Sequence, residues 1–416
     1  MIRKTGERTQ PTSSFHGRRQ MNKMMATFVV SGTIVLATIV GCIQTGRSQE
    51  VEKNVYAAWK NGPPSDPGYF PIAVWLQDPR YATKYKEAGF NLYVGLWRGP
   101  TEEQLAALKA AGMLVICHQN KIGLNHKDDR IIVGWMHGDE PDNAQSRGRG
   151  KGYGPPIPPE KIIADYRRIQ SADPSRPVLL NLGQGVAWDN WRGRGVRTNH
   201  PEDYPEYIKG CDIVSFDIYP VAHPHPAVQG KLWFVARGVD RLREWSSKKK
   251  VVWNCIECTR IKSGNKATPH QVKAEVWMSL IHGSTGLIYF VHEWMPRFNS
   301  HALLDDPVML SAVTGINQQI HDLSPVLNSP TVRGAAYVRS SPESVPIDLI
   351  VKRYKGETYL FAVAMRDAAV RGSFEVQGLP QVTTAEVLGE ARKIAVRNGR
   401  FIDTFKGYDV HLYRIR

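Results

Sequence analysis

Two glutamates follow apolar runs in this chain, each at the point where the run gives way to polar residues. Glu140 lies within the segment GWMHGDEPD (134–142), and Glu257 lies within VWNCIEC (252–258). A protonated and an ionised carboxyl group that converge on one ligand can transfer a proton and attack carbon in the same site. We therefore ask which elements would bring Glu140 and Glu257 together.

Short β-rich runs alternate with helical stretches from residue 70 onward, which is the pattern of a parallel sheet built from strand-helix units. Helical periodicity is present in 101–111, 162–171, 232–246, 270–282 and 307–323. Only residues 121–130 lie between the third and fourth runs, which is too short for a full crossover helix. Eight runs over about 220 residues predict a closed (β/α)8 TIM barrel. The predicted strands are 72–76, 92–96, 114–117, 131–136, 178–182, 213–218, 251–256 and 287–291.

Residues 69–328 form the predicted TIM barrel, and the pattern changes after Ser329-Pro330. Six short alternating runs with turns between them predict an antiparallel β-sandwich over 331–416. Function in such a barrel is built at the carboxyl ends of its strands. Glu140 and Glu257 end the fourth and seventh runs, so we expect them to meet above the barrel mouth.

The first 41 residues have the features of a secretory signal. Lys23 precedes the apolar run 26–40, and Gly41-Cys42 at its end resembles a bacterial lipobox. We predict a signal peptide over 1–41, lipidation at Cys42, a tether over 42–68 and a bacterial envelope location with a lipid anchor to the membrane. An uncleaved membrane anchor is the alternative. The formal net charge is +15, and 48 basic and 38 acidic residues remain after residue 41, so the exported part is still basic.

Three motifs in this order, GWMHGDEPD, FDIYP (216–220) and IYFVHEW (288–294), resemble the clan A glycoside hydrolases over residues 69–328. The resemblance implies a retaining glycosidase without a cofactor or metal. In it Glu140 is the general acid/base, Glu257 the nucleophile, Tyr219 a partner of the nucleophile and Trp294 a sugar platform. The clan commonly has Asn where this chain has Asp139, whose negative charge would raise the pKa of Glu140.

Other polar residues at predicted strand ends are candidates for substrate contacts. Arg98 ends the second strand, His118 with Gln119 and Asn120 ends the third, and Asp217 shares the strand face of Tyr219. Retention requires catalytic carboxyl groups ~5 to 5.5 Å apart, whereas inversion needs ~6.5 to 9.5 Å.

The predicted partner is an oligo- or polysaccharide, and two basic, glycine-rich loops lead to the hypothesis that it is anionic. Arginines in 146–153 and 188–197 match carboxylates or sulfates, and Trp188 or Trp191 could stack on a sugar ring. Solvated loops without a ligand are the alternative. No nucleic-acid partner is expected, because an exported chain without a recognition fold rarely meets one.

Two rival functions remain open. The departure at Asp139 favours a glycan-binding lipoprotein without turnover, and a metal-dependent barrel hydrolase would use His118, His137, Asp139, Asp217 and Glu257. Cys255 and Cys258 have a C-x-x-C spacing but would point to opposite faces of a strand, so we expect small buried residues there. Four cysteines after Cys42 are too few for a disulfide scaffold.

Overall fold

The computed structural model describes residues 54–262 and 264–416, which belong to one compact unit. The predicted signal segment, Cys42 and the first part of the tether lie outside the described residues. No helix among the described residues has the length and apolarity that a membrane crossing requires.

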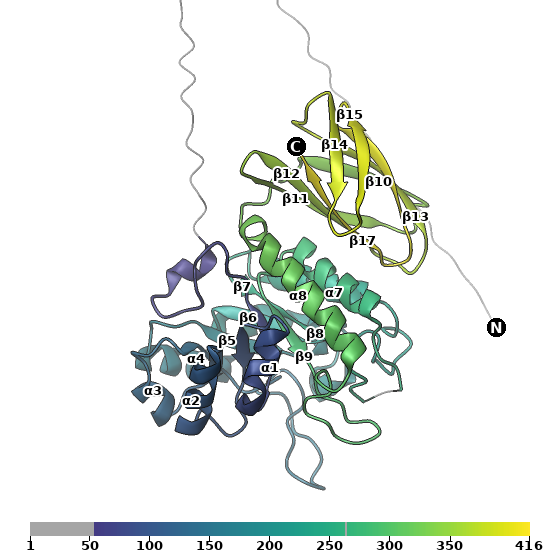
Figure 1. Cartoon of the computed structure of the whole chain (residues 1–416). Coiled ribbons are helices and arrows are strands. Elements are labelled where there is room, and N and C mark those ends of the chain that lie inside the picture. The colour runs from purple at the N-terminus through teal and green to yellow at the C-terminus, as the bar shows by residue number, and fades with distance from the viewer. Residues whose placement is uncertain (1–53, 263) are drawn as a thin grey trace, which may run out of the picture. The chain divides into compact units, whose positions relative to one another are not determined.

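A closed barrel of parallel strands occupies the first part of the described chain (Figure 1). The hydrogen-bonded order is β7-β6-β5-β4-β3-β2-β1-β9-β8. Because β7 and β8 are consecutive pieces of one strand, pairing of β7 with β6 and of β8 with β9 closes the ring. The barrel strands are β1 (Ile72–Trp75), β2 (Leu92–Val94), β3 (Leu114–His118), β4 (Ile132–Met136), β5 (Val178–Leu182), β6 (Ile213–Phe216), β7 (Val251–Val252), β8 (Asn254–Glu257) and β9 (Leu287–Phe290).

Eight helices accompany these strands. The helix after β3 has only five residues, as the short connection there predicts. Thr101 caps α2 and Thr268 caps α7 with a side-chain oxygen, each in a reciprocal box with the Gln three residues on. The helices are α1 (Ala82–Glu87), α2 (Glu102–Ala111), α3 (Lys121–Asn125), α4 (Pro159–Ala172), α5 (Tyr204–Tyr207), α6 (Trp233–Trp245), α7 (Pro269–His282) and α8 (Pro307–Leu327).

The seventh barrel strand is interrupted at Trp253. Its indole N–H donates to the Tyr56 hydroxyl inside the barrel at 2.8 Å, and its backbone N–H still donates to Val214 of β6. Asn254 then turns its amide toward Ser279 on α7, whereas Cys255 turns inward to Asn181 of β5. Side chains still alternate across the interruption, with Trp253 and Cys255 inside the barrel and Asn254 outside.

An antiparallel β-domain follows α8, as predicted for 331–416. Its strands belong to one continuous sheet in the order β10-β13-β16-β15-β14-β17-β12-β11, which encloses its own apolar core. Phe361 of β12 packs against Trp277 of α7 with ring centroids 5.0 Å apart, so the two parts share apolar contacts. The strands are β10 (Ala336–Ser341), β11 (Ile347–Tyr354), β12 (Glu357–Ala364), β13 (Val370–Val376), β14 (Val382–Val387), β15 (Arg392–Arg397), β16 (Arg400–Phe405) and β17 (Val410–Ile415).

Candidate active site

The turn after β4 gives Glu140 an unusual backbone. Its φ is +42°, a left-handed conformation that is rare for a residue with a long side chain. The Glu140 N–H donates to the Asn181 carbonyl, and its own carbonyl accepts from the Asn143 N–H and the Gln145 side chain. Such a conformation persists only where neighbouring contacts hold it, and it is typical of functional sites.

Asp142 anchors this turn from below. Its fully buried carboxylate accepts hydrogen bonds from the Gly183 N–H at 2.8 Å and the Tyr204 hydroxyl at 3.0 Å. The side chain of Arg194 donates to the Asp142 carbonyl and pairs with Asp203. Two further loops therefore fix the position of Glu140.

Glu140 meets Asp217, which follows β6, rather than a residue from the seventh strand. The two carboxyl groups are hydrogen-bonded, and Asp139 lies close enough to act on both electrostatically. Asp217 Oδ1 is buried and receives no hydrogen bond from a described donor. Asp139 is exposed, and Glu140 and Asp217 are partly exposed, so the cluster is accessible to solvent.

Crowding by protein and mutual repulsion raise the pKa of each acid in this cluster. Desolvation by the surrounding protein is the largest cause that raises the pKa of Glu140, to about 7, and the negative charge of Asp139 is the next. Desolvation raises the pKa of Asp139 to about 6, against a hydrogen bond from Asn181. Desolvation and the charge of Glu140 hold the pKa of Asp217 well above its usual range. Asp217 thus favours its protonated form more strongly than an ordinary aspartate does, and the pKa of Glu140 lies near neutrality.

Asn181 was missed by sequence reasoning, although one polar residue in the apolar run VLLNL marks it. Its side-chain NH2 group donates to Asp139 Oδ1 at 2.9 Å. Its side-chain oxygen, Oδ1, accepts from the Ser215 hydroxyl at 2.8 Å and from the Cys255 thiol. It thus links the acidic cluster to the polar layer inside the barrel. The clan commonly has an Asn at the position of Asp139. Here an amide also lies beside the acidic residues, but Asn181 of β5 provides it.

The structure does not bring Glu257 to Glu140, in contrast to the sequence expectation. Glu257 is fully buried, and its two carboxylate oxygens accept from the backbone N–H groups of Val221 and Ala222 at 2.6 and 2.8 Å. Its neighbouring acid is the buried Glu275 of α7. Burial raises the pKa of Glu257 to about 7, and no group of the Glu140 cluster contributes to that shift. Glu257 thus fastens the loop after β6 and lies outside the accessible cluster.

Aromatic rings extend from the acidic cluster to solvent. Tyr219 lies beside Asp217 and Cys255 and is in ring contact with Phe290 at 5.1 Å, so it borders Asp217 and not Glu257. Phe290 stacks on Trp294 at 5.7 Å, and Trp294 contacts Phe298 at 5.7 Å. Trp294 is 36% and Phe298 59% exposed. Sugar rings bind to such platforms through their apolar faces.

The remaining strand-end candidates have other partners. Arg98 is exposed, and its guanidinium lies over the Trp97 ring at 5.8 Å. His118 is exposed and lies beside the His137 backbone, and the surrounding protein lowers its pKa. Gln119 donates to the Ile169 carbonyl, and Asn120 caps α3. Gln119 and Asn120 are therefore engaged in holding loops and helices.

The two basic loops differ in their charge balance. In the second, Arg194 and Arg197 both pair with Asp203, at 2.7 and 2.5 Å. The first forms an exposed hairpin closed by a bridge between Ser146 and Tyr153. Its Arg147, Arg149 and Lys151 form no ion pair with any residue that the structure describes. Among the described residues, loop 146–153 therefore has three cationic side chains without an ion-pair partner, whereas Arg194 and Arg197 of the second loop are paired.

Neither tryptophan of the second loop is an open platform. Trp188 is only 7% exposed and contacts Trp191 and His223, and the Trp191 indole N–H donates to Asn143. The sequence interpretation of Trp188 as a ligand platform is therefore wrong in this structure, because the ring is packed into the loop that carries it.

The residues of the metal-site alternative do not form one group. His137 is buried and bonds to the Gly210 carbonyl through Nε2, and Glu257 is held by backbone amides. Within 54–262 and 264–416, no three His, Cys, Asp or Glu side chains gather as metal ligands would. Cys255 and Cys258 are buried free thiols with different neighbours, Asn181 and the Phe290 carbonyl.

Solved structures that match this chain at low identity include glycoside hydrolases. An Anoxybacillus α-amylase is 11% identical with a TM-score of 0.49, over 84% of this chain and 98% of that chain. An α-amylase from Geobacillus thermoleovorans, solved with acarbose, is 13% identical with a TM-score of 0.49, over 86% and 99%. A GH30 endoxylanase from Clostridium papyrosolvens is 11% identical with a TM-score of 0.43, over 83% and 95%.

No protein-family model and no curated protein matches the sequence. At these identities and TM-scores the structural similarities do not assign an activity to the chain, and the function has to be argued from its own residues.

Proposed function

We propose that this protein is a glycoside hydrolase in which Glu140 and Asp217 are the catalytic carboxyl pair. The observation that carries the proposal is the hydrogen-bonded contact of these two acids at the carboxyl ends of β4 and β6. Cleavage of an acetal needs one acid that holds a proton and one that is ionised. The raised pKa values support this difference, because the pKa of Asp217 is held well above its usual range while that of Glu140 is raised to about 7.

The aromatic row supports a carbohydrate over other substrates. Tyr219, Phe290 and Trp294 lead from the acids to the surface, where Trp294 and Phe298 are open to solvent. Apolar ring faces and carboxyl groups side by side match the two kinds of surface that a sugar presents. A general-acid role for Asp217 then makes Glu140 the base or nucleophile.

The proposal retains the predicted retaining mechanism, but the second catalytic carboxyl group is Asp217 instead of Glu257. A direct hydrogen bond holds the two carboxyl groups closer than the ~5 to 5.5 Å that retention requires, so a bound sugar must separate them. Inversion would require a wider opening, to ~6.5 to 9.5 Å. The smaller displacement favours retention, and the anomer released first, measured by NMR, tests it.

The exposed hairpin 146–153 supports the hypothesis of an anionic glycan, because Arg147, Arg149 and Lys151 form no ion pair with a described residue and can contact a ligand. We further propose that the protein works in the bacterial envelope, anchored through a lipid on Cys42. Acidic and neutral glycans compared at low and high salt test the first point, because ionic contacts at an exposed site weaken with salt. Loss of metabolic lipid labelling in Cys42→Ser tests the second.

The decisive experiment incubates the purified full-length chain with a panel of oligo- and polysaccharides and identifies the released sugars by mass spectrometry. Glu140→Gln is expected to lower kcat/KM by at least ~10²-fold, in line with general acid-base catalysis. Glu160→Gln is the matched control, because Glu160 is exposed on α4 and forms no ion pair in the described chain. Tight glycan binding without any released sugar would instead identify a binding protein.

A further inference from the structure

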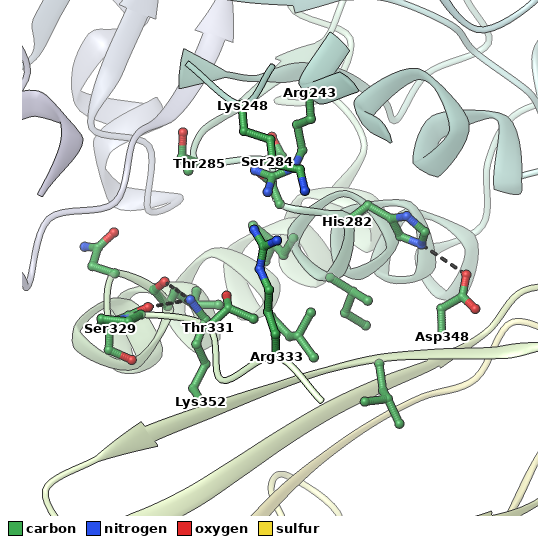
Figure 2. A pocket seen from close by; sticks show the side chains of 18 of the residues that line it. Arg243, Lys248, His282, Ser284, Thr285, Ser329, Thr331, Arg333, Asp348 and Lys352 are labelled. Atoms are coloured by element: carbon green, nitrogen blue, oxygen red, sulfur yellow. Dashed lines mark hydrogen bonds and ion pairs between the residues drawn. The ribbon is translucent and has the colours of Figure 1, made fainter. Parts of the chain in front are cut away.

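A cavity of about 1300 Å³ lies between the barrel and the β-domain (Figure 2). Its barrel side is made by Tyr56, by Ser284 and Thr285 before β9, and by the end of α6. Because Ser284 and Thr285 enter a strand rather than leave one, the cavity lies at the end of the barrel opposite to Glu140. Its other side is made by the connection after α8 and by β10 and β11.

Three cationic side chains converge in this cavity. Figure 2 shows Arg243 and Lys248 from the α6 side pointing toward Arg333, which rises from the connection to the β-domain. Arg243 is partly buried and donates to the Gly283 carbonyl. The side chains of Lys248 and Arg333 make no hydrogen bond or ion pair with the residues that the structure describes. Burial and the neighbouring charge of Arg333 lower the pKa of Arg243, so these like charges repel one another across the space.

The carboxylates of the cavity form no ion pair with these three cations, and Asp240 acts on Arg243 only through its charge. Asp240 and Asp348 both bind the His282 ring, at 2.8 and 3.1 Å, and together they raise the pKa of His282 to about 9. Both aspartates are thus paired with the His282 ring, and Figure 2 shows His282 to one side of the converging cations. Glu244 is exposed to solvent and pairs with none of the three. Repelling guanidinium groups without a carboxylate between them are stabilised by a bound anion.

We propose that this cavity is a binding site for an oxyanion, a phosphate or sulfate group held between Arg243 and Arg333 with Lys248 at its edge. The planar guanidinium groups suit tetrahedral oxyanions because each can donate two parallel hydrogen bonds. The group can belong to a soluble phosphate or sulfate or to the headgroup of an anionic lipid. Asn54, the first described residue, lines the same cavity.

Calorimetric titration of the full-length chain with inorganic phosphate and with sulfate tests the proposal, beside sedimentation with phosphatidylglycerol vesicles and with phosphatidylcholine vesicles. We expect saturable binding of at least one anionic probe, weakened by sodium chloride. Arg333→Gln is expected to weaken it at least ~10-fold, since hydrogen bonds between charged partners are the strong ones. Binding of the soluble anions identifies a free anion site, and binding of phosphatidylglycerol vesicles alone identifies a headgroup site.

Arg371→Gln is the matched control, because Arg371 is an exposed, unpaired arginine of the described β-domain that does not line the cavity. Arg333 is exposed on a connection, so its replacement should leave the thermal unfolding temperature unchanged without ligand. Absence of binding to all four probes would overturn the proposal. Equal weakening by Arg333→Gln and Arg371→Gln would overturn it as well, because the attraction would then be a property of overall charge.

Discussion

Two carboxyl pairs in this barrel each include a glutamate at a strand end but have different surroundings. Glu140 and Asp217 touch each other at an accessible position, and Asp217 Oδ1 lacks a fixed donor. Glu257 and Glu275 also touch, but Glu257 is fully buried and both of its oxygens are satisfied by backbone N–H groups. Burial raises the pKa of Glu140 and of Glu257 alike, to about 7.

A raised pKa therefore does not identify a catalytic acid in this molecule. The two pairs are distinguished by solvent access, since a reacting group must be able to reach a ligand. Buried oxygens without a donor occur in both pairs, on Asp217 and on Glu275. We interpret Glu140 and Asp217 as the reactive pair and Glu257 with Glu275 as a fastening of the loop that carries Asp217 and Tyr219.

The largest expected effect is on turnover. Asp217→Asn should lower kcat/KM by at least ~10³-fold, because an amide cannot deliver a proton to the leaving oxygen. The unfolding free energy should stay close to that of the wild type, since an uncharged amide of the same size replaces the protonated acid. Steady-state kinetics and urea denaturation measure both quantities. Full activity in Asp217→Asn would remove Asp217 from the catalytic pair.

The second effect is on stability. Glu257→Gln turns one oxygen into an NH2 group that faces the N–H of Val221 or Ala222, so a buried hydrogen bond becomes a clash of donors. We expect a loss of ~2 to 3 kcal/mol in unfolding free energy. Glu275→Gln is the matched control, because its amide can still donate to Glu257. A stable but inactive Glu257→Gln enzyme would instead restore Glu257 as the nucleophile.

His282 provides a third buried titrating group, with partners of opposite charge. Asp240 and Asp348 raise its pKa to about 9, above the ordinary 6.5 of the unfolded chain. The folded state thus binds the proton more tightly, so the stabilisation is complete below pH 6.5 and disappears as the pH rises through 9. His282→Gln should cost about 2 kcal/mol at pH 6.5, after allowance for the solvent exposure of the two aspartates. At pH 9.5 the difference between variant and wild type should vanish, and an equal difference at both pH values would contradict the assignment.

Asp139 tests the electrostatics of the accessible pair. Its negative charge helps to raise the pKa of Glu140, so Asp139→Asn should move the limb of the pH-rate profile that reports Glu140 to lower pH, by ~1 unit. The same limb should not move in Glu160→Gln. A profile unchanged by Asp139→Asn would mean that another group controls it.

The smallest effect is expected at the edge of the aromatic row. Trp294→Ala should raise KM about 5-fold and leave kcat nearly unchanged, because the ring contributes contact area far from the reacting bond. Trp97→Ala is the control, since Trp97 is 67% exposed and belongs to another loop. Equal changes in both variants would show that the row has no special part in binding.

Sequence reasoning correctly predicted the fold, and it named both Glu140 and Asp217 as candidate site residues without pairing them. Apolar runs at regular spacing predicted the barrel strands within about two residues, and the segment GDEPD placed Glu140 at the end of β4. The predicted influence of Asp139 on Glu140 is also present in the structure. Asn181 went unnoticed because a single polar residue in a buried strand does not reveal whether it faces the barrel axis or a helix.

The chain's pattern of apolar and polar residues by itself determined that a parallel barrel and an antiparallel domain would form, because burial depends mainly on that pattern. Only the tertiary structure decided which carboxyl faces which. The left-handed backbone of Glu140 and the hydrogen bonds of Glu257 to the N–H groups of Val221 and Ala222 set the directions of these two carboxyl groups. Both depend on contacts with residues far away in the sequence, so Asp217 and not Glu257 became the neighbour of Glu140.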